Sequence, residues 1–293
     1  MNNINTLRTL KQKHRLLFFV KKIDNKQFLW QYKYIIEGGI LMNILITNDD
    51  GIYADGIIEL AKEISKIANV YVVAPESQRS ATGHSITIHS PIMVQEANMG
   101  NNIKAYSISG TPADCVKVGI EALFKDINFD LVLSGINNGP NLGTDVIYSG
   151  TVSAAIEGLV LNKPSIAVSY NEFKVKSEVY KEGAKHIAQL INNIKDKLHL
   201  LNDCILNVNI PNTEVKGWKI TKLGERKYDN VMEERISPFG QRYFWIGGSI
   251  KELEQEEESD IICVNNGYIS ITPVNIEMTN LEKFEMLKDI KLL

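Results

Sequence analysis

This chain of 293 residues has few cysteines, no excess of basic over acidic residues and no long apolar run. Its formal net charge of -3 argues against general nucleic-acid binding, which needs a basic surface. No apolar run approaches the roughly 20 residues of a membrane-spanning helix, so we expect no membrane partner. Three widely spaced cysteines form neither a disulfide framework nor a metal-ligand pattern, which favours a reducing compartment, the cytoplasm. They are Cys115, Cys204 and Cys263.

Three familiar sequence motifs are also missing. There is no G-x-x-x-x-G-K-[ST] loop, which excludes P-loop NTPases. There is no G-x-S-x-G elbow, which argues against serine hydrolysis of the α/β-hydrolase type. The G-x-G-x-x-G dinucleotide fingerprint does not follow the first expected strand. With 44% hydrophobic and 23% charged residues, the composition is that of an ordinary globular protein with one large or two modest α/β domains.

Residues 1–41 differ from the rest of the chain in charge. They carry eight basic and two acidic residues, a balance of +6, which leaves -9 for the remainder. The segment lacks a clean apolar core, a small-residue cleavage site and serine, so it is a poor secretory or transit signal. A basic arm for a membrane surface or RNA is one interpretation. We prefer another, in which Met42 is the natural start and residues 1–41 are a misannotated extension outside the native fold.

Short apolar runs alternate with helical periodicity over residues 43–194. We expect buried strands at 43–47, 70–73, 130–134 and 164–170, and two half-exposed strands at 85–95 and 103–108. We expect helices at 55–67, 111–124, 149–161 and 177–194. Asp55 is expected to cap the first of these helices, and Thr111 the second. This βαβ rhythm predicts an α/β fold with a doubly wound, mostly parallel sheet.

The rhythm changes after about residue 200. Strands are expected at 205–210, 218–221, 243–246 and 268–272 with no helix between them, and the acidic run 251–260 is expected to be an exposed loop. A β-rich extension of this kind often pairs with a partner subunit. We therefore expect residues 42–293 to form the folded domain, with a C-terminal part that serves oligomerisation.

The most informative segment is 42–51, an apolar run that ends in Asp49, Asp50 and Gly51. In open α/β sheets, ligands bind beyond the carboxyl ends of the strands. Successive side chains on a strand point to opposite sides, so the two acids share a site only if the strand stops between them, as Gly51 permits. Two adjacent carboxylates with no basic residue close in sequence predict a divalent cation. The alternative is that one acid only caps the next helix.

Two further loops follow neighbouring strands and should reach the same edge of the sheet. One supplies Ser80 and His84, and the other supplies Asn137 and Asn141. Carboxylate, hydroxyl and amide oxygens together suit Mg²⁺, Mn²⁺ or Ca²⁺ and disfavour zinc. Each of these residues also has a structural interpretation: Ser80 could close a turn, the two asparagines could occupy positive-φ turns, and His84 could be an ordinary loop histidine.

An anion site is also indicated where Ser149, Gly150 and Thr151 open an expected helix. The N–H groups and hydroxyls at such a helix start can hold a phosphate. Simple capping by Ser149 explains the same residues. The remaining candidate phosphate contacts are Asn48, Asn141 and His84. His84 is also a possible proton donor.

These segments resemble the survival protein E (SurE) family of metal-dependent nucleotidases. The resemblance rests on five stretches, which are ILITNDDGIYADG at 44–56, VAPESQRSATGHSIT at 73–87, SGTPADCV at 109–116, LSGINNGPNLGTDVIYSGTVSAAIEG at 133–158 and GYISITP at 267–273. It covers residues 42–293 and leaves 1–41 unmatched.

The resemblance implies a Rossmann-like domain with a C-terminal β-hairpin extension that assembles homodimers or homotetramers. It implies a 5'-nucleotidase, a phosphomonoesterase that acts on nucleoside 5'- and 3'-monophosphates, with short polyphosphate as a further substrate of some members. It places the ligands of one divalent cation per subunit at Asp49, Asp50, Ser80 and Asn137, with no departure at these positions. The loop at 76–78 varies within the family, which leaves substrate preference open.

Asp49 and Asp50 are therefore the candidate catalytic residues, with the cation binding a phosphate oxygen. Whether Asp49 orients the attacking water or attacks phosphorus itself stays open at this stage. A non-catalytic nucleotide- or metal-binding module is a second hypothesis, but paired carboxylates repel a bare phosphate unless a metal lies between them. A phosphatase of the haloacid dehalogenase kind is a third; it expects acids at alternate positions, and these are adjacent.

Overall fold

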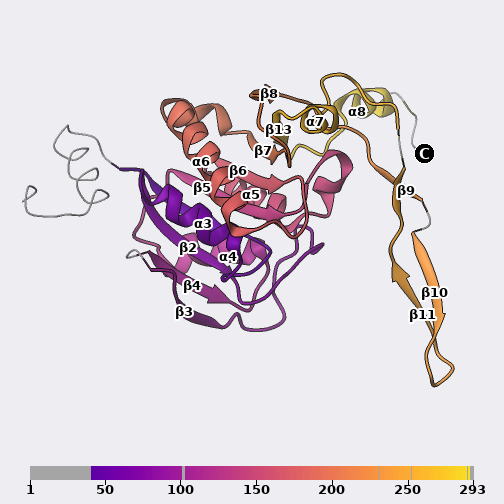
Figure 1. The fold of residues 1–293 in the computed structure, drawn as a ribbon, viewed down its shortest axis with the longest axis horizontal. Coiled ribbons are helices and arrows are strands. Elements are labelled where there is room, and N and C mark those ends of the chain that lie inside the picture. The colour runs from indigo at the N-terminus through magenta and orange to yellow at the C-terminus, as the bar shows by residue number, and fades with distance from the viewer. Residues whose placement is uncertain (1–40, 101–102, 230, 252, 289, 291–293) are drawn as a thin grey trace, which may run out of the picture.

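A nine-stranded sheet forms the centre of the computed structural model, with strand order β3-β4-β2-β1-β5-β6-β7-β13-β8 (Figure 1). The structure describes residues 41–100, 103–229, 231–251, 253–288 and 290. Apart from Leu41, the predicted N-terminal extension lies outside the described residues. The strands of the sheet are β1 (Asn43–Thr47), β2 (Asn69–Pro75), β3 (Val94–Asn98), β4 (Lys104–Ile108), β5 (Leu131–Asn138), β6 (Ser165–Tyr170), β7 (Cys204–Ile210), β8 (Trp218–Ile220) and β13 (Ile269–Asn275).

The inner strands of this sheet are parallel, as the βαβ rhythm predicts. β1 lies between β2 and β5, and β6 and β7 continue the parallel order beyond β5. β3 pairs antiparallel with β4 near one edge, and β13 pairs antiparallel with β7 near the other. The predicted α/β class and the mostly parallel, Rossmann-like sheet are therefore confirmed.

Helices cover both faces of the sheet. α3 packs beside α6, and α4 packs beside α5 (Figure 1). Their bounds are α3 (Asp55–Ile64), α4 (Pro112–Val118), α5 (Gly150–Val160) and α6 (Ser177–Ile194). A short π-helical turn, Gly119–Leu123, extends α4, and a 3-10 helix, Lys195–Leu201, extends α6. Within the part of the chain that the structure describes, no helix is both long and apolar enough to cross a bilayer.

The central strand is packed from both sides. Ile44 and Ile46 of β1 belong to the core under α3 and α6, whereas Leu45 belongs to the core under α4. All three side chains are fully buried. Burial stabilises the fold by roughly 1.5–3 kcal/mol for each such side chain. The carboxyl end of β1, which carries the two acids, is therefore a rigid point of the molecule.

The predicted strand at 85–95 is wrong over most of its length, since only Val94–Asn98 forms a strand there. The preceding segment binds the start of α4 instead. Asp114 accepts hydrogen bonds from the Thr87 N–H at 3.0 Å and from the Thr87 hydroxyl at 2.6 Å. The Thr111 hydroxyl donates to the carbonyl oxygen of Ser85 at 2.7 Å. These side chains satisfy backbone groups that a strand would have paired in a ladder.

Two element boundaries also differ from the prediction. Ala54, not Asp55, is the N-cap of α3. Asp55 lies in the first turn, where its negative charge interacts favourably with the helix dipole. β5 continues four residues past Ser134 to Asn138, so part of the expected loop is strand. The predicted cap of α4 is correct, because Thr111 and Asp114 form a capping box.

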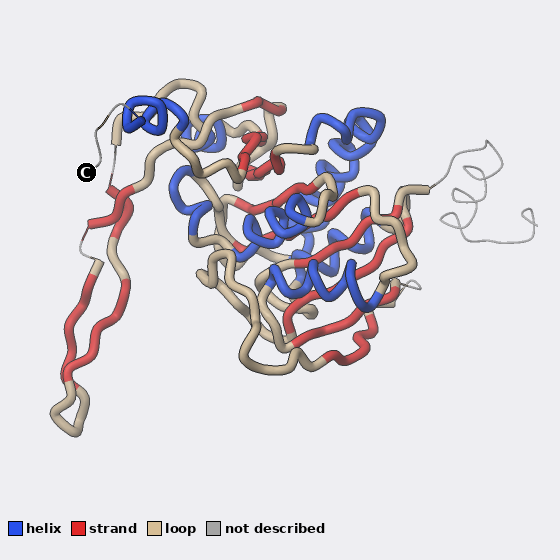
Figure 2. The backbone as a smooth tube through the Cα atoms, turned by 180° about the vertical axis from the view of Figure 1, so that it is seen from behind, coloured by secondary structure: helices blue, strands red, loops and turns tan. Residues whose placement is uncertain are grey.

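An arm projects from the body at the C-terminal side of the chain (Figure 2). It is a ribbon of two antiparallel strand pairs, β10 with β11 and β12 with β9. Every residue of β10 and β11 is exposed. The four strands are β9 (Lys227–Asp229), β10 (Met232–Ile236), β11 (Arg242–Ile246) and β12 (Ser249–Lys251).

The region after residue 200 was expected to contain strands without helices, but it contains both. Two helices follow the arm, α7 (Asp260–Asn265) and α8 (Leu281–Lys288). The acidic run at 251–260 is mostly loop, but its last residue, Asp260, is fully buried and opens α7. β13 and β8 complete the main sheet, so among the described strands only β9 to β12 lie outside it.

Candidate active site

The candidate site lies at the carboxyl ends of three adjacent parallel strands, β2, β1 and β5. Asp49 and Asp50 follow β1, the loop with Ser80 follows β2, and Asn137 lies at the end of β5. Hydrogen bonds tie these segments to one another. The convergence at one edge is what the parallel order requires.

The two acids lie within a tight turn, from Asn48 to Gly51, at the end of β1. Asn48 donates its side-chain amide to the Gly51 carbonyl oxygen at 2.9 Å and accepts the Gly51 N–H at 3.2 Å. Gly51 has φ +106°, a conformation in which a side chain would be strained. Asn48 is fully buried, and both ends of its amide serve this turn. Its predicted contact with phosphate stays a prediction.

Asp49 lies beneath the N-terminus of α5. Its Oδ1 accepts a 2.5 Å hydrogen bond from the Thr151 hydroxyl, and its carbonyl oxygen accepts the Arg79 N–H at 2.7 Å. A Cβ on Gly150 would stand 2.8 Å from Asp49 Cβ, so only glycine allows this approach without a shift. Burial raises the pKa of Asp49 to about 7, and the neighbouring charge of Asp50 adds to this effect. The hydrogen bond from Thr151 acts in the opposite direction and lowers the pKa. A carboxylate in this position needs a positive partner.

Asp50 joins the other two loops. Its Oδ2 accepts the Asn138 N–H at 2.9 Å, which fixes it to the end of β5. The Gln78 side-chain amide donates to the Ser80 hydroxyl at 2.9 Å and contacts Asp50 Oδ1 at 3.4 Å. Burial raises the pKa of Asp50 as well. Gln78 was not predicted as a site residue, yet it links two of the candidate ligands.

Asn137 completes the candidate ligand set. Its amide nitrogen donates to the Gly139 carbonyl oxygen at 2.8 Å, which leaves Oδ1 as the atom suited to a cation. Among the described residues, no group of three or more His, Cys, Asp or Glu side chains has the arrangement of a metal site. A cation here therefore depends on two carboxylates and neutral oxygens, the donors that Mg²⁺, Mn²⁺ and Ca²⁺ accept.

The start of α5 has the predicted form. Ser149 is its N-cap and accepts the Val152 N–H at 3.1 Å, so the capping interpretation holds for its hydroxyl. Gly150 and Thr151 form the first turn directly against Asp49. The positive end of the helix dipole thus lies against Asp49, where it favours a negatively charged ligand.

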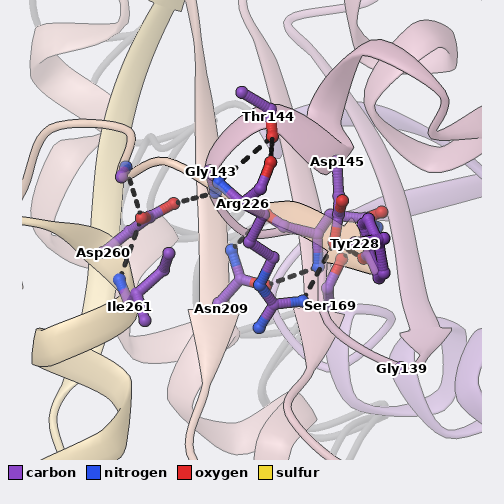
Figure 3. Close-up of polar contacts among 12 residues, drawn as sticks. Gly139, Gly143, Thr144, Asp145, Ser169, Asn209, Arg226, Tyr228, Asp260 and Ile261 are labelled. Atoms are coloured by element: carbon purple, nitrogen blue, oxygen red, sulfur yellow. Dashed lines mark hydrogen bonds and ion pairs between the residues drawn. The ribbon is translucent and has the colours of Figure 1, made fainter. Parts of the chain in front are cut away.

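Asn141 is buried and held by strands that the sequence did not connect with the site. It donates its side-chain amide to Ser169 Oγ at 2.6 Å and its N–H to Asn209 Oδ1 at 2.9 Å. Its carbonyl oxygen accepts the amides of Asn207 at 2.8 Å and Asn209 at 2.9 Å (Figure 3 shows Asn209 and Ser169). These bonds fix the backbone of the loop after β5; a phosphate contact by Asn141 stays a prediction.

His84 contacts α5 further along the helix rather than the acids. Its Nε2 lies 2.8 Å from Glu157 Oε2, and Lys117 Nζ lies 3.7 Å from Glu157 Oε1. Hydrogen bonding to His84 holds the pKa of Glu157 below its ordinary value. The structure therefore shows His84 paired with a carboxylate, and its predicted role as proton donor or phosphate contact stays a prediction.

A cavity of about 260 Å³ adjoins Asp50. Asp50, Gln78 and Asn138 line it from the site. Lys174 and Tyr180 line it from the opposite wall. The Lys174 N–H donates to Asn138 Oδ1 at 2.7 Å, which ties the wall to the end of β5. The site thus has a small polar recess beside the candidate cation position.

Comparison with known proteins agrees with this geometry. Residues 44–230 match the family model described as survival protein SurE. A protein named 5'-nucleotidase SurE from Alkaliphilus metalliredigens is 49% identical over 257 residues, which cover 86% of this chain and 99% of that protein. A 5'-nucleotidase SurE from Clostridium botulinum is 47% identical over 252 residues, which cover 84% of this chain and 99% of that protein.

A solved structure shares the fold. The crystal structure of the SurE protein from Aquifex aeolicus superposes with a TM-score of 0.74 at 38% identity. The alignment covers 84% of this chain and 98% of that one. The predicted family is therefore confirmed by sequence and by fold: this chain belongs to the SurE family.

Proposed function

We propose that this protein is a divalent-cation-dependent 5'-nucleotidase, which hydrolyses nucleoside 5'-monophosphates, and 3'-monophosphates, to nucleoside and phosphate. The carrying observation is the placement of Asp49 at a sheet edge against the first turn of α5, with Asp50 next to it in the chain. Close relatives bear the name 5'-nucleotidase SurE, which supports the same activity. Short polyphosphate is a further candidate substrate.

The donor set fits one Mg²⁺ or Mn²⁺ ion per subunit, with Ca²⁺ as a weaker candidate. Asp49 and Asp50 would hold it, and Ser80 and Asn137 would complete the protein ligands. The raised pKa values of both acids fit this assignment, because a cation would relieve the cost of burying their charges. Such an ion supplies charge neutralisation at the phosphate and a lower pKa for the attacking water.

The chain's own residues position the substrate. The first-turn N–H groups of Gly150 and Thr151 are suited to the phosphate oxygens that face α5. Thr151 also fixes one carboxylate oxygen of Asp49 through its hydroxyl. The recess beside Asp50 has room for part of the leaving nucleoside.

A non-catalytic nucleotide- or metal-binding module is the alternative function. It would need only the phosphate cradle at the start of α5. The buried Asp49 carboxylate next to that cradle and the partly buried Asp50 carboxylate beside it oppose a bare phosphate, so the pair would be unfavourable in a module that binds nucleotide without a cation. We therefore favour the enzyme.

We also propose that the protein assembles into homodimers or homotetramers through the arm. Its exposed face carries large apolar side chains, among them Phe244, Trp245 and Ile246, and such a patch marks an interaction surface. Sedimentation of the protein against a Trp245→Ser, Ile246→Ser variant tests this assignment, which requires the variant to dissociate. All three cysteines are free, which supports a cytoplasmic location.

Phosphate release tests the proposed activity. Purified protein is incubated with adenosine and guanosine 5'-monophosphates, with Mn²⁺ or Mg²⁺ and then with excess chelator. We expect release that the chelator abolishes. Binding of nucleotide without any release would favour the non-catalytic module, and release that survives the chelator would contradict the cation's role.

A further inference from the structure

One segment joins the two halves of the candidate site. Residues 139–149, here called the bridging loop, run from the end of β5, next to Asn137, to the N-cap of α5. A 3-10 helix, η2 (Gly143–Ile147), forms its second part. The first part is held by β6 and β7 through Asn141, as described above. The second part is held by the C-terminal extension, 81 to 117 residues further along the chain.

Asp260 is the buried centre of this second set of contacts. Its side chain is fully buried, and its two oxygens accept N–H groups from different segments: Oδ2 from Gly143 at 2.9 Å and Oδ1 from Gly224 at 2.8 Å (Figure 3). Oδ1 also accepts the Ile261 N–H at 2.9 Å. A Cβ on Gly143 would stand 2.7 Å from the Gly224 carbonyl oxygen, so the two backbones touch directly. One carboxylate thus joins the bridging loop, the root of the arm and α7.

Arg226 makes a second connection between the root of the arm and the bridging loop. Its guanidinium donates to Asp145 Oδ2 at 2.9 Å, and the Tyr228 hydroxyl donates to the same oxygen at 2.7 Å (Figure 3). The backbone of Arg226 exchanges two bonds with the Thr144 hydroxyl, at 2.7 and 3.2 Å. The side chains of Arg226 and Asp145 are 12% and 18% exposed, so this ion pair is far less screened than a surface pair.

The hydrogen bonds of Asp260 and Arg226 described above go to residues other than Asp49 and Asp50, and the proposed reaction does not use the charges of Asp260 and Arg226. Asp260 fixes the start of η2 through Gly143, and Arg226 fixes its middle through Asp145. Ser149, the N-cap beside Asp49, follows η2 by two residues. The position of the phosphate cradle therefore depends on contacts that the extension supplies.

We infer that Asp260 and Arg226 are positioning residues for the nucleotidase reaction: they hold the bridging loop, and with it Asn141 and Ser149, in the arrangement that turnover requires. This inference rests on the proposed function. It assigns the extension a role in catalysis in addition to assembly. The buried carboxylate and the shielded ion pair act on the same loop, so they should behave as one unit.

The test compares Arg226→Lys and Asp260→Asn with wild type and with a matched control, Lys227→Ala. Lys227 is adjacent in sequence, and its side chain forms an exposed ion pair with Glu225. For each protein we measure kcat and KM for adenosine 5'-monophosphate at saturating Mn²⁺, the Mn²⁺ dissociation constant, the melting temperature, and amide hydrogen exchange over residues 143–149.

Positioning predicts a specific pattern. A displacement of about 1 Å at a site can cost about 100-fold in rate, so we expect kcat of both variants to fall by about tenfold or more. Mn²⁺ affinity should fall by less than kcat, because Asp49 and Asp50 directly follow the buried strand β1, which these contacts do not hold. Exchange over 143–149 should rise, and Lys227→Ala should match wild type in every respect.

Other outcomes would overturn the inference. If kcat is unchanged in folded variants while only the melting temperature falls, the contacts are structural and the inference is wrong. If amide hydrogen exchange over residues 143–149 is unchanged in the variants, the inference is also wrong, whatever their activity. If Asp260→Asn does not fold, Arg226→Lys decides alone. A wild type that releases no phosphate with Mn²⁺ contradicts the proposed function itself, which is a different result from an active wild type with equally active variants.

Discussion

The Thr151 hydroxyl donates a 2.5 Å hydrogen bond to Asp49 Oδ1, and this bond joins the first turn of α5 to the end of β1. The two residues are 102 positions apart in the chain. This contact places the positive end of the α5 dipole next to a buried carboxylate. A phosphate and a cation are the ligands that such an arrangement favours together.

Asp49→Asn should abolish turnover while the fold persists. The substitution keeps the size and most hydrogen bonds of the side chain but removes the charge that holds the cation. We expect kcat to fall by about 1,000-fold, the upper range for losing one preorganised electrostatic group. Steady-state phosphate release measures this, with circular dichroism to confirm folding. Asp126→Asn, at an exposed acid, is the control; near-normal rates in Asp49→Asn would show that the site is misplaced.

Thr151→Val should weaken cation binding without creating a cavity. Valine has nearly the same shape, but Asp49 Oδ1 loses its donor, and a hydrogen bond to a charged group contributes about 1.5–3 kcal/mol. The Mn²⁺ dissociation constant should rise by roughly ten- to hundredfold, because each 1.4 kcal/mol is about tenfold. Calorimetric titration measures it. Thr151→Ser should restore most of the affinity, and an equal loss in the serine variant would argue against the hydroxyl.

Cation binding should weaken as the pH falls below about 7, the value to which burial and Asp50 raise the pKa of Asp49. Without a cation the folded state binds this proton more tightly than the unfolded state, whose pKa is near 3.8. The metal-free protein therefore loses stability from this group as the pH rises from about 4 to 7. A cation must displace the proton.

Melting temperatures with and without Mn²⁺ at pH 6 and pH 8 check this linkage. The increase caused by Mn²⁺ should be larger at pH 8, where Asp49 is ionised before the cation binds. Asp49→Asn should remove the difference between the two pH values. An increase that is larger at pH 6 would contradict the sign of the effect.

Gly150→Ala should lower both stability and activity. The added Cβ would stand 2.8 Å from Asp49 Cβ and 3.0 Å from its Oδ2, closer than atoms pack without a shift. Overpacking of this kind costs about 1–3 kcal/mol. Urea denaturation measures the loss, and kcat measures the displacement of the acid. Gly247→Ala is the control, because a Cβ there meets nothing within 4 Å.

The sequence predicted the sheet correctly, and it singled out Asp49 and Asp50 as candidate ligands, because both features leave local patterns. Apolar runs followed by polar loops mark parallel strands, and an adjacent acid pair at the end of one run is unusual enough to stand out. The misassigned strand at 85–95 shows the limit of such patterns. Its alternation was real, but its backbone groups bind Asp114 and Thr111, which lie on another element.

Residues that act through long-range contacts were missed. Asp260 was hidden in an acidic run that looked like a solvated loop, although it is the buried member of that run. Gln78 sits in a loop with no pattern of its own. Asn207 and Asn209 did leave a signal: two amides at alternate positions of an apolar strand must find buried partners, and here they hold the backbone of Asn141.

The most direct measurement is an anomalous difference map from crystals soaked in Mn²⁺. The account predicts one strong peak per subunit between Asp49 and Asp50, at roughly 2.0–2.6 Å from an oxygen of each, the range for hard cations. Oxygens of Ser80 and Asn137 should lie beside the same peak. Absence of density between the two acids, in crystals of a protein whose activity Mn²⁺ supports, would contradict it.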